Sequence, residues 1–272
     1  MNKIAVQNLG MIITERCNLN CAHCLRGKCT NKIMNDDVIT ATLGQFCHIH
    51  NLAICGGEPT LALDRIEKIF SYIIENEILV DMVTLAINGT IYSEEFLKLL
   101  DYIEEYINYQ KLERALSTFT ISWDEFHYSE VERLGIEKEY LENIQRYKKN
   151  KHYYGMQRLT GKLFREGNAE SLDSSLTMPM TPMMPHITYV GDKAKFDKEN
   201  GLCNIGPIIT VNVNGTITEC DASITHQETL YNYGNVLTDS IEDIYLKKGI
   251  LVLKPRIWLK KIGKEMIRYY NI

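Results

Sequence analysis

The sequence of 272 residues has no apolar run that approaches the roughly 20 residues needed to cross a bilayer, so we expect no transmembrane segment. It also lacks an excess of basic residues, since 30 lysines and arginines stand against 35 aspartates and glutamates, a formal net charge of −5. A broad nucleic-acid-binding surface needs the opposite balance. The remaining composition, 45% hydrophobic and 24% charged, is typical of a globular protein, and we expect no nucleic-acid partner.

The eight cysteines are not spread along the chain as they would be in a secreted disulfide framework. Three of them stand close together, and the first residues do not have the pattern of a secretory signal. We therefore expect a cytoplasmic location, where the cysteines remain thiols. Residues 1–9 are too few to form a separate substrate-binding domain before the first predicted strand.

The clustered cysteines follow an apolar run at residues 11–14 that indicates a short buried strand. A loop at the carboxyl end of a strand is where α/β proteins place their chemistry. The three thiols are Cys17, Cys21 and Cys24. Thiolates on one short loop can converge on one metal centre, which is either an iron–sulfur cluster or a structural zinc ion. Zinc would need a fourth ligand, for which Cys29 and His23 are candidates.

Periodic hydrophobic patterns predict further strands and helices along the chain. Predicted strands cover residues 10–14, 51–55, 83–87, 116–122 and 156–160. Predicted helices run from Asp36 to about Phe46, along the apolar stripe Ile66–Ile74, from a cap at Ser93, and from a Ser129–Glu132 capping box to about Asn150 with an interruption at Gly135. Five or six such units indicate an α/β fold with a parallel sheet. Too little chain remains for a closed eight-stranded barrel.

Polar or glycine-rich turns follow three of these predicted strands. Gly56-Gly57-Glu58-Pro59 comes first, and its two glycines allow the backbone to approach a ligand closely. Asn88-Gly89-Thr90 ends the next strand, and Ser122 and Asp124 end the one after, with His127 nearby. Taken singly, each of these turns is also an ordinary connection between elements.

The Cys-x3-Cys-x2-Cys spacing, followed one strand–helix unit later by Gly-Gly-Glu-Pro, resembles the radical S-adenosylmethionine (SAM) superfamily. The resemblance implies a partial (β/α)6 TIM-like barrel that is open on one side to admit substrate. It also implies that Cys17, Cys21 and Cys24 hold a [4Fe–4S] cluster whose fourth iron binds the amino and carboxylate groups of SAM. The reduced cluster would cleave SAM to a 5′-deoxyadenosyl radical, which would abstract hydrogen from a substrate. An electron donor such as flavodoxin or ferredoxin is implied as a partner.

The same resemblance implies which residues surround SAM. They are Gly56, Gly57, Glu58, Asn88, Ser122 and Asp124. Of these, Glu58 is expected to make little direct contact with SAM. For His127, two roles remain open: a surface residue, or a participant in the site. Relatives often carry Gly-Arg-Ala where this chain has Gly167-Asn168-Ala169. The chain therefore lacks the usual arginine at this position, and Arg165 is the candidate to replace it.

The pattern changes at Cys203, after which residues 208–213 and 216–218 predict a β-hairpin with an Asn-Gly turn. Cys203 and Cys220 flank this hairpin, and their spacing resembles the opening of SPASM and Twitch domains, which hold auxiliary clusters. No cysteine follows Cys220, and two thiolates alone do not hold a typical four-ligand cluster. We therefore expect a degenerate appendage without a second cluster.

Three alternatives to a clusterless appendage remain open. Non-cysteine ligands, the substrate or another chain could complete a cluster at Cys203 and Cys220, and the nearest candidates in the chain are Asp221 and His226. We expect three parts in the chain. They are a barrel at 1–200, the hairpin appendage at 201–249 and a basic C-terminal helix at 250–272.

The sequence therefore predicts a radical SAM enzyme, and its substrate class is less defined. SPASM and Twitch relatives often modify ribosomally made peptides, whereas others act on small molecules such as sugars or nucleosides. A peptide substrate would need a separate recognition protein or direct docking in the open barrel. An alternative of another class, a non-catalytic zinc- or iron–sulfur-binding sensor, explains the thiols but not the turns on successive strands.

Overall fold

The computed structural model describes residues 4–110, 116–159, 161–179, 186–189, 203–206, 208–218, 232–241 and 243–244. Strands and helices alternate through the first part of the chain. These elements are β1 (Ile4–Ile12), α1 (Asp36–Leu43), β2 (Phe46–Cys55), η1 (Pro59–Leu61), α2 (Leu63–Glu75), β3 (Leu79–Ile87), α3 (Glu94–Tyr109), β4 (Leu116–Ser122), α4 (Glu125–Leu134), α5 (Glu137–Tyr147) and β5 (Tyr153–Gln157). Short elements follow: β6 (Leu163–Phe164), η2 (Gly167–Ser171), β7 (Thr177–Met178), β8 (His186–Tyr189), β9 (Cys203–Gly206), β10 (Ile209–Val211), β11 (Thr216–Thr218) and β12 (Gly234–Asn235).

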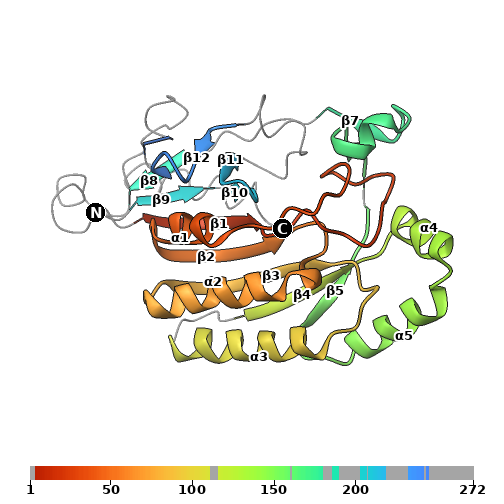
Figure 1. Cartoon of the computed structure of the whole chain (residues 1–272), viewed down its shortest axis with the longest axis horizontal. Coiled ribbons are helices and arrows are strands. Elements are labelled where there is room, and N and C mark those ends of the chain that lie inside the picture. The colour runs from red at the N-terminus through yellow and green to blue at the C-terminus, as the bar shows by residue number, and fades with distance from the viewer. Residues whose placement is uncertain are drawn as a thin grey trace, which may run out of the picture.

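Strands β1 to β5 pair in chain order, and every pair is parallel. Parallel neighbours need a crossover connection, which the intervening helices supply. Figure 1 shows α2 and α3 lying along one side of this sheet, with α4 and α5 near the end of β5. The predicted α/β fold with a parallel sheet is confirmed. Strand β6 pairs with β7 in a separate small sheet rather than with β5.

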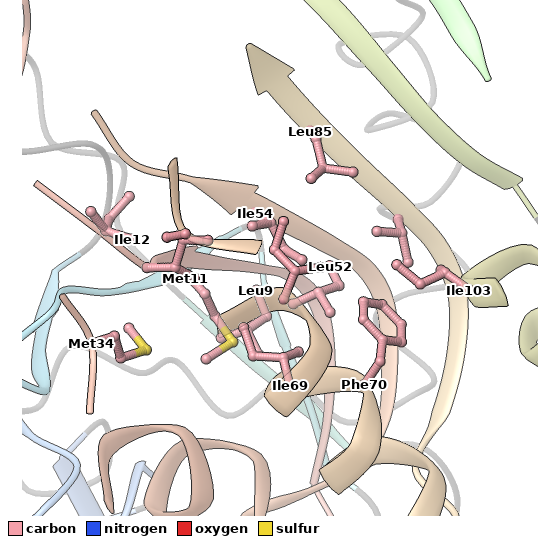
Figure 2. Packing of buried hydrophobic residues seen from close by; sticks show 14 of the residues in the cluster. Leu9, Met11, Ile12, Met34, Leu52, Ile54, Ile69, Phe70, Leu85 and Ile103 are labelled. Atoms are coloured by element: carbon pink, nitrogen blue, oxygen red, sulfur yellow. The ribbon is translucent and has the colours of Figure 1, made fainter. Parts of the chain in front are cut away.

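The core lies between the parallel sheet and the helices. Helix α2 buries the predicted apolar stripe, with Ile66, Ile69, Phe70 and Ile73 fully buried. Figure 2 shows Ile69 and Phe70 against Leu52 and Leu9 of the sheet. Burial of each such side chain stabilises the fold by about 1.5–3 kcal/mol. This core fixes the strands whose carboxyl ends carry the motifs of the sequence.

Helix α1 is shorter than the sequence predicts. It begins as expected at Asp36, where the Asn35 side chain accepts a hydrogen bond from the Val38 amide at 2.9 Å. It ends at Leu43 instead of about Phe46, because Phe46 opens β2 and pairs with Ile4 in the sheet. The long-range strand pairing overrides the local helical pattern here.

The predicted start of the helix after β4 is wrong. Helix α4 is capped by Asp124, whose carboxylate accepts hydrogen bonds from the Phe126 and His127 amides. Ser129 lies within the helix and donates its hydroxyl to the Glu125 carbonyl oxygen at 2.8 Å. The interruption expected at Gly135 is confirmed, since this glycine has φ +67° and ends α4 before α5 begins.

The predicted hairpin near residue 215 is present as β10 and β11, which pair antiparallel. Gly215 adopts φ +84°, the left-handed conformation that the Asn-Gly turn predicts. Strand β10 also pairs parallel with β1, so the hairpin extends the main sheet on the side of β1 away from β2. Cys203 opens β9, beside Ile4 of β1.

Several predictions fall outside the described part of the chain. The side chain of Cys203, the whole of Cys220 and the predicted basic helix at 250–272 lie there, so the second cluster and the C-terminal helix stay predictions. Among the described residues, no helix is both long enough and apolar enough to span a membrane.

Candidate functional site

The three clustered cysteines line one pocket at the carboxyl ends of β1 to β5, with a volume of about 230 Å³. They lie on the loop between β1 and α1, where two successive turns bend the chain. The Cys24 amide donates to the Cys21 carbonyl oxygen at 3.1 Å, and the Gly27 amide donates to the Cys24 carbonyl oxygen at 3.0 Å. Predicted SAM-site residues that line the same pocket are Gly56, Gly57, Asn88 and Ser122.

The chemistry of this pocket fits a soft metal centre. Burial raises the pKa of Cys21 and of Cys24 above the ordinary thiol value, and contact with the Cys29 thiol together with burial raises that of Cys17. Bare thiolates are therefore disfavoured here, and a metal centre would supply the positive charge that ligating thiolates require. No aspartate or glutamate of the described chain lines the pocket, so sulfur is its main anionic donor.

Gly56 and Gly57 are needed because the turn after β2 passes directly against the backbone of the cysteine loop. A Cβ on Gly57 would collide with the Arg16 carbonyl oxygen, and one on Gly56 would lie 2.8 Å from the Thr14 carbonyl oxygen. The Gly57 amide donates to that Thr14 oxygen at 2.8 Å. The two glycines thus bring the second motif into register with the first.

Glu58 is buried behind the pocket and does not line it. Its carboxylate accepts hydrogen bonds from the Asn88 amide at 2.6 Å and from the Thr60 amide and hydroxyl at 3.1 and 2.6 Å. Burial raises its pKa despite these donors. Glu58 therefore acts on the site by fixing the turn after β3 to the turn after β2.

Asn88 connects the end of β3 to the cysteine loop. Its side-chain oxygen accepts hydrogen bonds from the Thr90 amide and hydroxyl, which fixes the orientation of the amide. Its Nδ2 donates to the Asn18 Oδ1 at 2.8 Å and lies 3.8 Å from the Cys17 sulfur. The predicted SAM residue Asn88 is thus also a hydrogen-bond donor to the cysteine loop.

Asp124 lies between two histidines. Its Oδ2 is 2.6 Å from the His127 Nδ1 and 3.4 Å from the His23 Nε2, and its side chain is only 7% exposed. Burial opposes ionisation, but the hydrogen bonds from His127 and His23 hold the pKa of Asp124 well below its usual range. Both histidines line the cysteine pocket, as Ser122 does, whereas Asp124 does not.

A second, larger hollow of about 650 Å³ has Asp124 in its lining. Its lining combines aromatic, apolar and charged side chains from the ends of β4 and β5 and from α4 and α5. These residues are Trp123, Asp124, Glu125, Tyr128, Leu141, Arg158 and Leu159. The ring of Trp123 stacks on Tyr140 with centroids 5.6 Å apart, which holds one wall of the hollow in place.

The structure also brings Gly167 and Asn168 onto the cysteine loop, which the sequence reasoning missed. The Asn168 amide donates to the Cys24 carbonyl oxygen at 2.9 Å, and its Nδ2 donates to the Cys21 carbonyl oxygen at 3.0 Å. Gly167 has φ +59°, and a Cβ there would lie 2.5 Å from three backbone atoms of the loop. The sequence does contain a glycine followed by a side-chain donor, which could have indicated this contact. The mismatch with Gly-Arg-Ala drew attention to the missing arginine instead.

The structure also places Arg165 and Cys29, whose roles the sequence did not decide. Arg165 donates its Nε to the Thr177 hydroxyl at 3.1 Å and lines neither hollow. Cys29, the candidate fourth zinc ligand, contacts the Cys17 thiol and donates its own to the Leu19 carbonyl oxygen at 3.5 Å. Cys55, at the end of β2, also lines the pocket and was not among the predicted site residues.

Comparison with known proteins gives matches of different extent. A 74-residue stretch is 32% identical to an uncharacterized protein of Methanocaldococcus jannaschii, and it covers 26% of this chain and 26% of that protein. The chain thus spans about a quarter of the length of this curated relative.

Comparison with solved structures gives a match to anSMEcpe with bound AdoMet and the Cp18Cys peptide. It is 17% identical, with a TM-score of 0.47 over 89% of this chain and 80% of that one. Streptococcus suis SuiB bound to the precursor peptide SuiA is 11% identical, with a TM-score of 0.41 over 88% of this chain and 64% of that one.

The family model of the radical SAM superfamily matches residues 11–156, more than half of the 272 residues. The matched span begins just before the cysteine loop and ends within β5, so it contains the three thiols and the turns after β2, β3 and β4. The chain belongs to the radical SAM superfamily.

Proposed function

We propose that this chain binds a [4Fe–4S] cluster at Cys17, Cys21 and Cys24 and catalyses the reductive cleavage of SAM. The observation that carries the proposal is the common pocket, in which these three thiols face the ends of successive parallel strands. Three cysteines leave one iron of a four-iron cluster without a protein ligand. This open position is what separates a SAM-cleaving centre from a structural zinc site, which is closed by four protein ligands.

When bound and reduced, such a cluster with SAM supplies a 5′-deoxyadenosyl radical that abstracts hydrogen from a substrate. The chain's own residues would hold and orient SAM beside the thiols. Gly56 and Gly57 line the pocket beside the thiols, so a bound ligand would contact them there. The Ser122 hydroxyl and the His127 ring, both on the pocket wall, offer polar contacts to the remainder of SAM.

Asp124 and Glu58 have positioning roles in this proposal. Asp124 orients His23 and His127 and caps α4, while Glu58 fixes the Asn88 turn. Neither carboxylate lines the cysteine pocket. We therefore assign direct contact with SAM to Gly56, Gly57, Asn88 and Ser122, and indirect effects to the two acidic residues.

For the substrate, we propose a ribosomally made peptide. The proposal rests on the resemblance of residues 203–244 to SPASM and Twitch appendages, and the hairpin of that segment is present. The hollow that Asp124 helps to line, at about 650 Å³, has the size of a ligand pocket and room for a few amino-acid side chains. A flavodoxin or ferredoxin in a reducing compartment would supply the electron, and a separate protein could present the peptide.

The test of SAM cleavage is anaerobic reconstitution with iron and sulfide, followed by reduction in the presence of SAM. We expect 5′-deoxyadenosine from the wild-type protein and none from Cys17→Ala. Cys47→Ala, which removes a half-buried thiol of β2 that does not line the pocket, is the matched control and should remain active. Zinc uptake without iron uptake, or a cluster without 5′-deoxyadenosine, would favour the sensor alternative.

The substrate class needs a separate experiment. A short reading frame beside the gene would be expressed with deuterated amino acids and incubated with the active enzyme. Deuterium in the 5′-deoxyadenosine and a changed peptide mass would support peptide modification. Deuterium transfer only from labelled sugars or nucleosides would contradict it while leaving SAM cleavage intact.

A further inference from the structure

We propose that His48, His50 and Asp81 form a binding site for a zinc-like divalent metal ion, separate from the cysteine pocket. The three residues lie in the amino-terminal halves of β2 and β3, whereas the cysteine loop follows the carboxyl end of β1. In a parallel sheet these are opposite edges. The site would therefore be independent of SAM and of the iron–sulfur chemistry.

The sheet itself holds the three side chains together. His48 and His50 are two residues apart on β2 and so point to the same face. The pairs Ile49–Val80 and Asn51–Met82 in the ladder set His50 directly opposite Asp81. The His48 Nε2 lies 2.7 Å from the Asp81 Oδ1, and the His50 Nδ1 lies 2.7 Å from the Asp81 Oδ2.

The donor atoms converge closely enough to share one ion. One ring nitrogen from each histidine and one carboxylate oxygen all lie within 4.8 Å of one another. In a tetrahedral zinc site with bonds of about 2.0–2.2 Å, ligand atoms are about 3.3–3.6 Å apart. Small side-chain rotations would reach this spacing, since the two imidazole centroids are already only 4.1 Å apart.

The charge of the cluster also favours a cation. An aspartate carboxylate is ordinarily ionised at neutral pH, so Asp81 brings one negative charge between the two imidazoles. Among the described residues, the Asp81 carboxylate contacts these two imidazoles and forms no salt bridge with a lysine or arginine. The side chains are 21%, 40% and 26% exposed, so water can reach the site and fill a fourth position.

A second cluster of possible metal ligands in the same molecule differs from the proposed site in its charge balance. Asp101, Glu104 and His152 also converge within 4.8 Å. There, however, the Lys151 ammonium lies 2.9 Å from Asp101 and 2.5 Å from Glu104 and already provides the positive charge. We expect no metal at this second cluster, which makes it the matched control.

The test is zinc binding by the cluster-loaded protein, in which iron occupies the thiols of the cysteine loop. After equilibrium dialysis against zinc, we expect one zinc per chain for the wild-type protein and for the control variant His152→Gln, measured by elemental analysis. His48→Gln and Asp81→Asn should each weaken zinc binding by at least about tenfold, a loss seen even when a hydrogen-bond partner of a metal ligand is removed.

X-ray absorption at the zinc edge then identifies the ligands in the wild-type protein without any variant. We expect nitrogen and oxygen neighbours with the scattering pattern of imidazole. Sulfur neighbours would show that zinc had entered the cysteine loop and would overturn the proposal. Equal zinc content in wild type, His48→Gln and Asp81→Asn would overturn it as well, provided that circular dichroism shows all three folded.

Discussion

Two edges of the same sheet carry a carboxylate between two histidines, and they differ in how the carboxylate is held. At the carboxyl edge, Asp124 bridges His23 and His127 beside the cysteine pocket. At the amino edge, Asp81 bridges His48 and His50. The Asp124 side chain is 7% exposed and that of Asp81 is 26% exposed.

The additional partners of each carboxylate explain what it can do. Asp124 also accepts the Phe126 and His127 amides at the start of α4, so its orientation is fixed by the helix as well as by the histidines. Among the described residues, the Asp81 carboxylate has hydrogen bonds with the two imidazoles and with no backbone amide, so it can turn toward an ion. The same three residue types thus make a rigid structural element at one edge and a candidate metal site at the other.

The largest expected effect on stability comes from removing Asp124. Asp124→Ala loses a helix cap and charge-assisted hydrogen bonds in a nearly buried place, so we expect a loss of about 2–4 kcal/mol in the free energy of unfolding. Asp81→Ala should cost about 1 kcal/mol or less, because its pairs are more exposed. Urea unfolding of both variants in the cluster-free state measures the difference. Equal losses of unfolding free energy in the two variants would contradict the proposed difference between the two edges.

Gly57→Ala tests how tightly the carboxyl edge is packed. The new Cβ would meet the Arg16 carbonyl oxygen, so the cysteine loop must shift, at a cost of about 1–3 kcal/mol and with reduced cluster retention. Gly155→Ala on β5 is the control, because no atom lies within 4 Å of its Cβ position. Iron content after gel filtration and thermal unfolding give the two readouts. Full iron retention in Gly57→Ala would contradict the close packing.

Asn168→Ala should have a smaller effect. It removes one side-chain hydrogen bond to the Cys21 carbonyl oxygen, which is worth about 1 kcal/mol. We expect faster loss of iron to a chelator than in the wild-type protein. Asn76→Ala also removes an amide donor from a backbone carbonyl oxygen, that of Tyr72, and should leave the rate of iron loss unchanged. Identical rates in the two variants would remove Asn168 from the support of the cysteine loop.

The smallest expected effect is the pH dependence that Asp124 adds. Its pKa is lowered in the folded state, so its stabilisation is present above the unfolded value of about 3.9 and is lost as the pH falls below it toward the folded value. The stability difference between wild type and Asp124→Asn should therefore shrink between about pH 5 and pH 3. A difference that stays constant over that range, measured by urea unfolding of the cluster-free protein, would contradict this assignment.

The sequence predicted features that depend on local pattern. Strand 116–122 matched β4 in full because polar and apolar residues alternate along it. The predicted start of α4 is wrong because Asp124 and Ser129 are both good capping residues, and in the structure it is Asp124 that accepts the Phe126 and His127 amides. Local patterns cannot rank two such caps.

Long-range contacts were beyond the reach of the sequence. The hydrogen bond between Asn168 and Cys21 joins residues 147 positions apart, and β10 pairs with β1 across most of the chain. The collision that makes Gly57 necessary likewise joins two strand ends, because Gly57 follows β2 and the Arg16 carbonyl oxygen follows β1. The motifs therefore indicated the chemistry, while the side chains that support the cysteine loop became visible only in three dimensions.

The central claim is that three cysteines hold a cluster with one iron open to SAM, and electron paramagnetic resonance of the reduced protein tests it most directly. We predict that adding SAM changes the cluster signal in wild type and in Cys47→Ala. Cys17→Ala should give no such SAM-dependent change. A wild-type signal that is identical with and without SAM would contradict the claim.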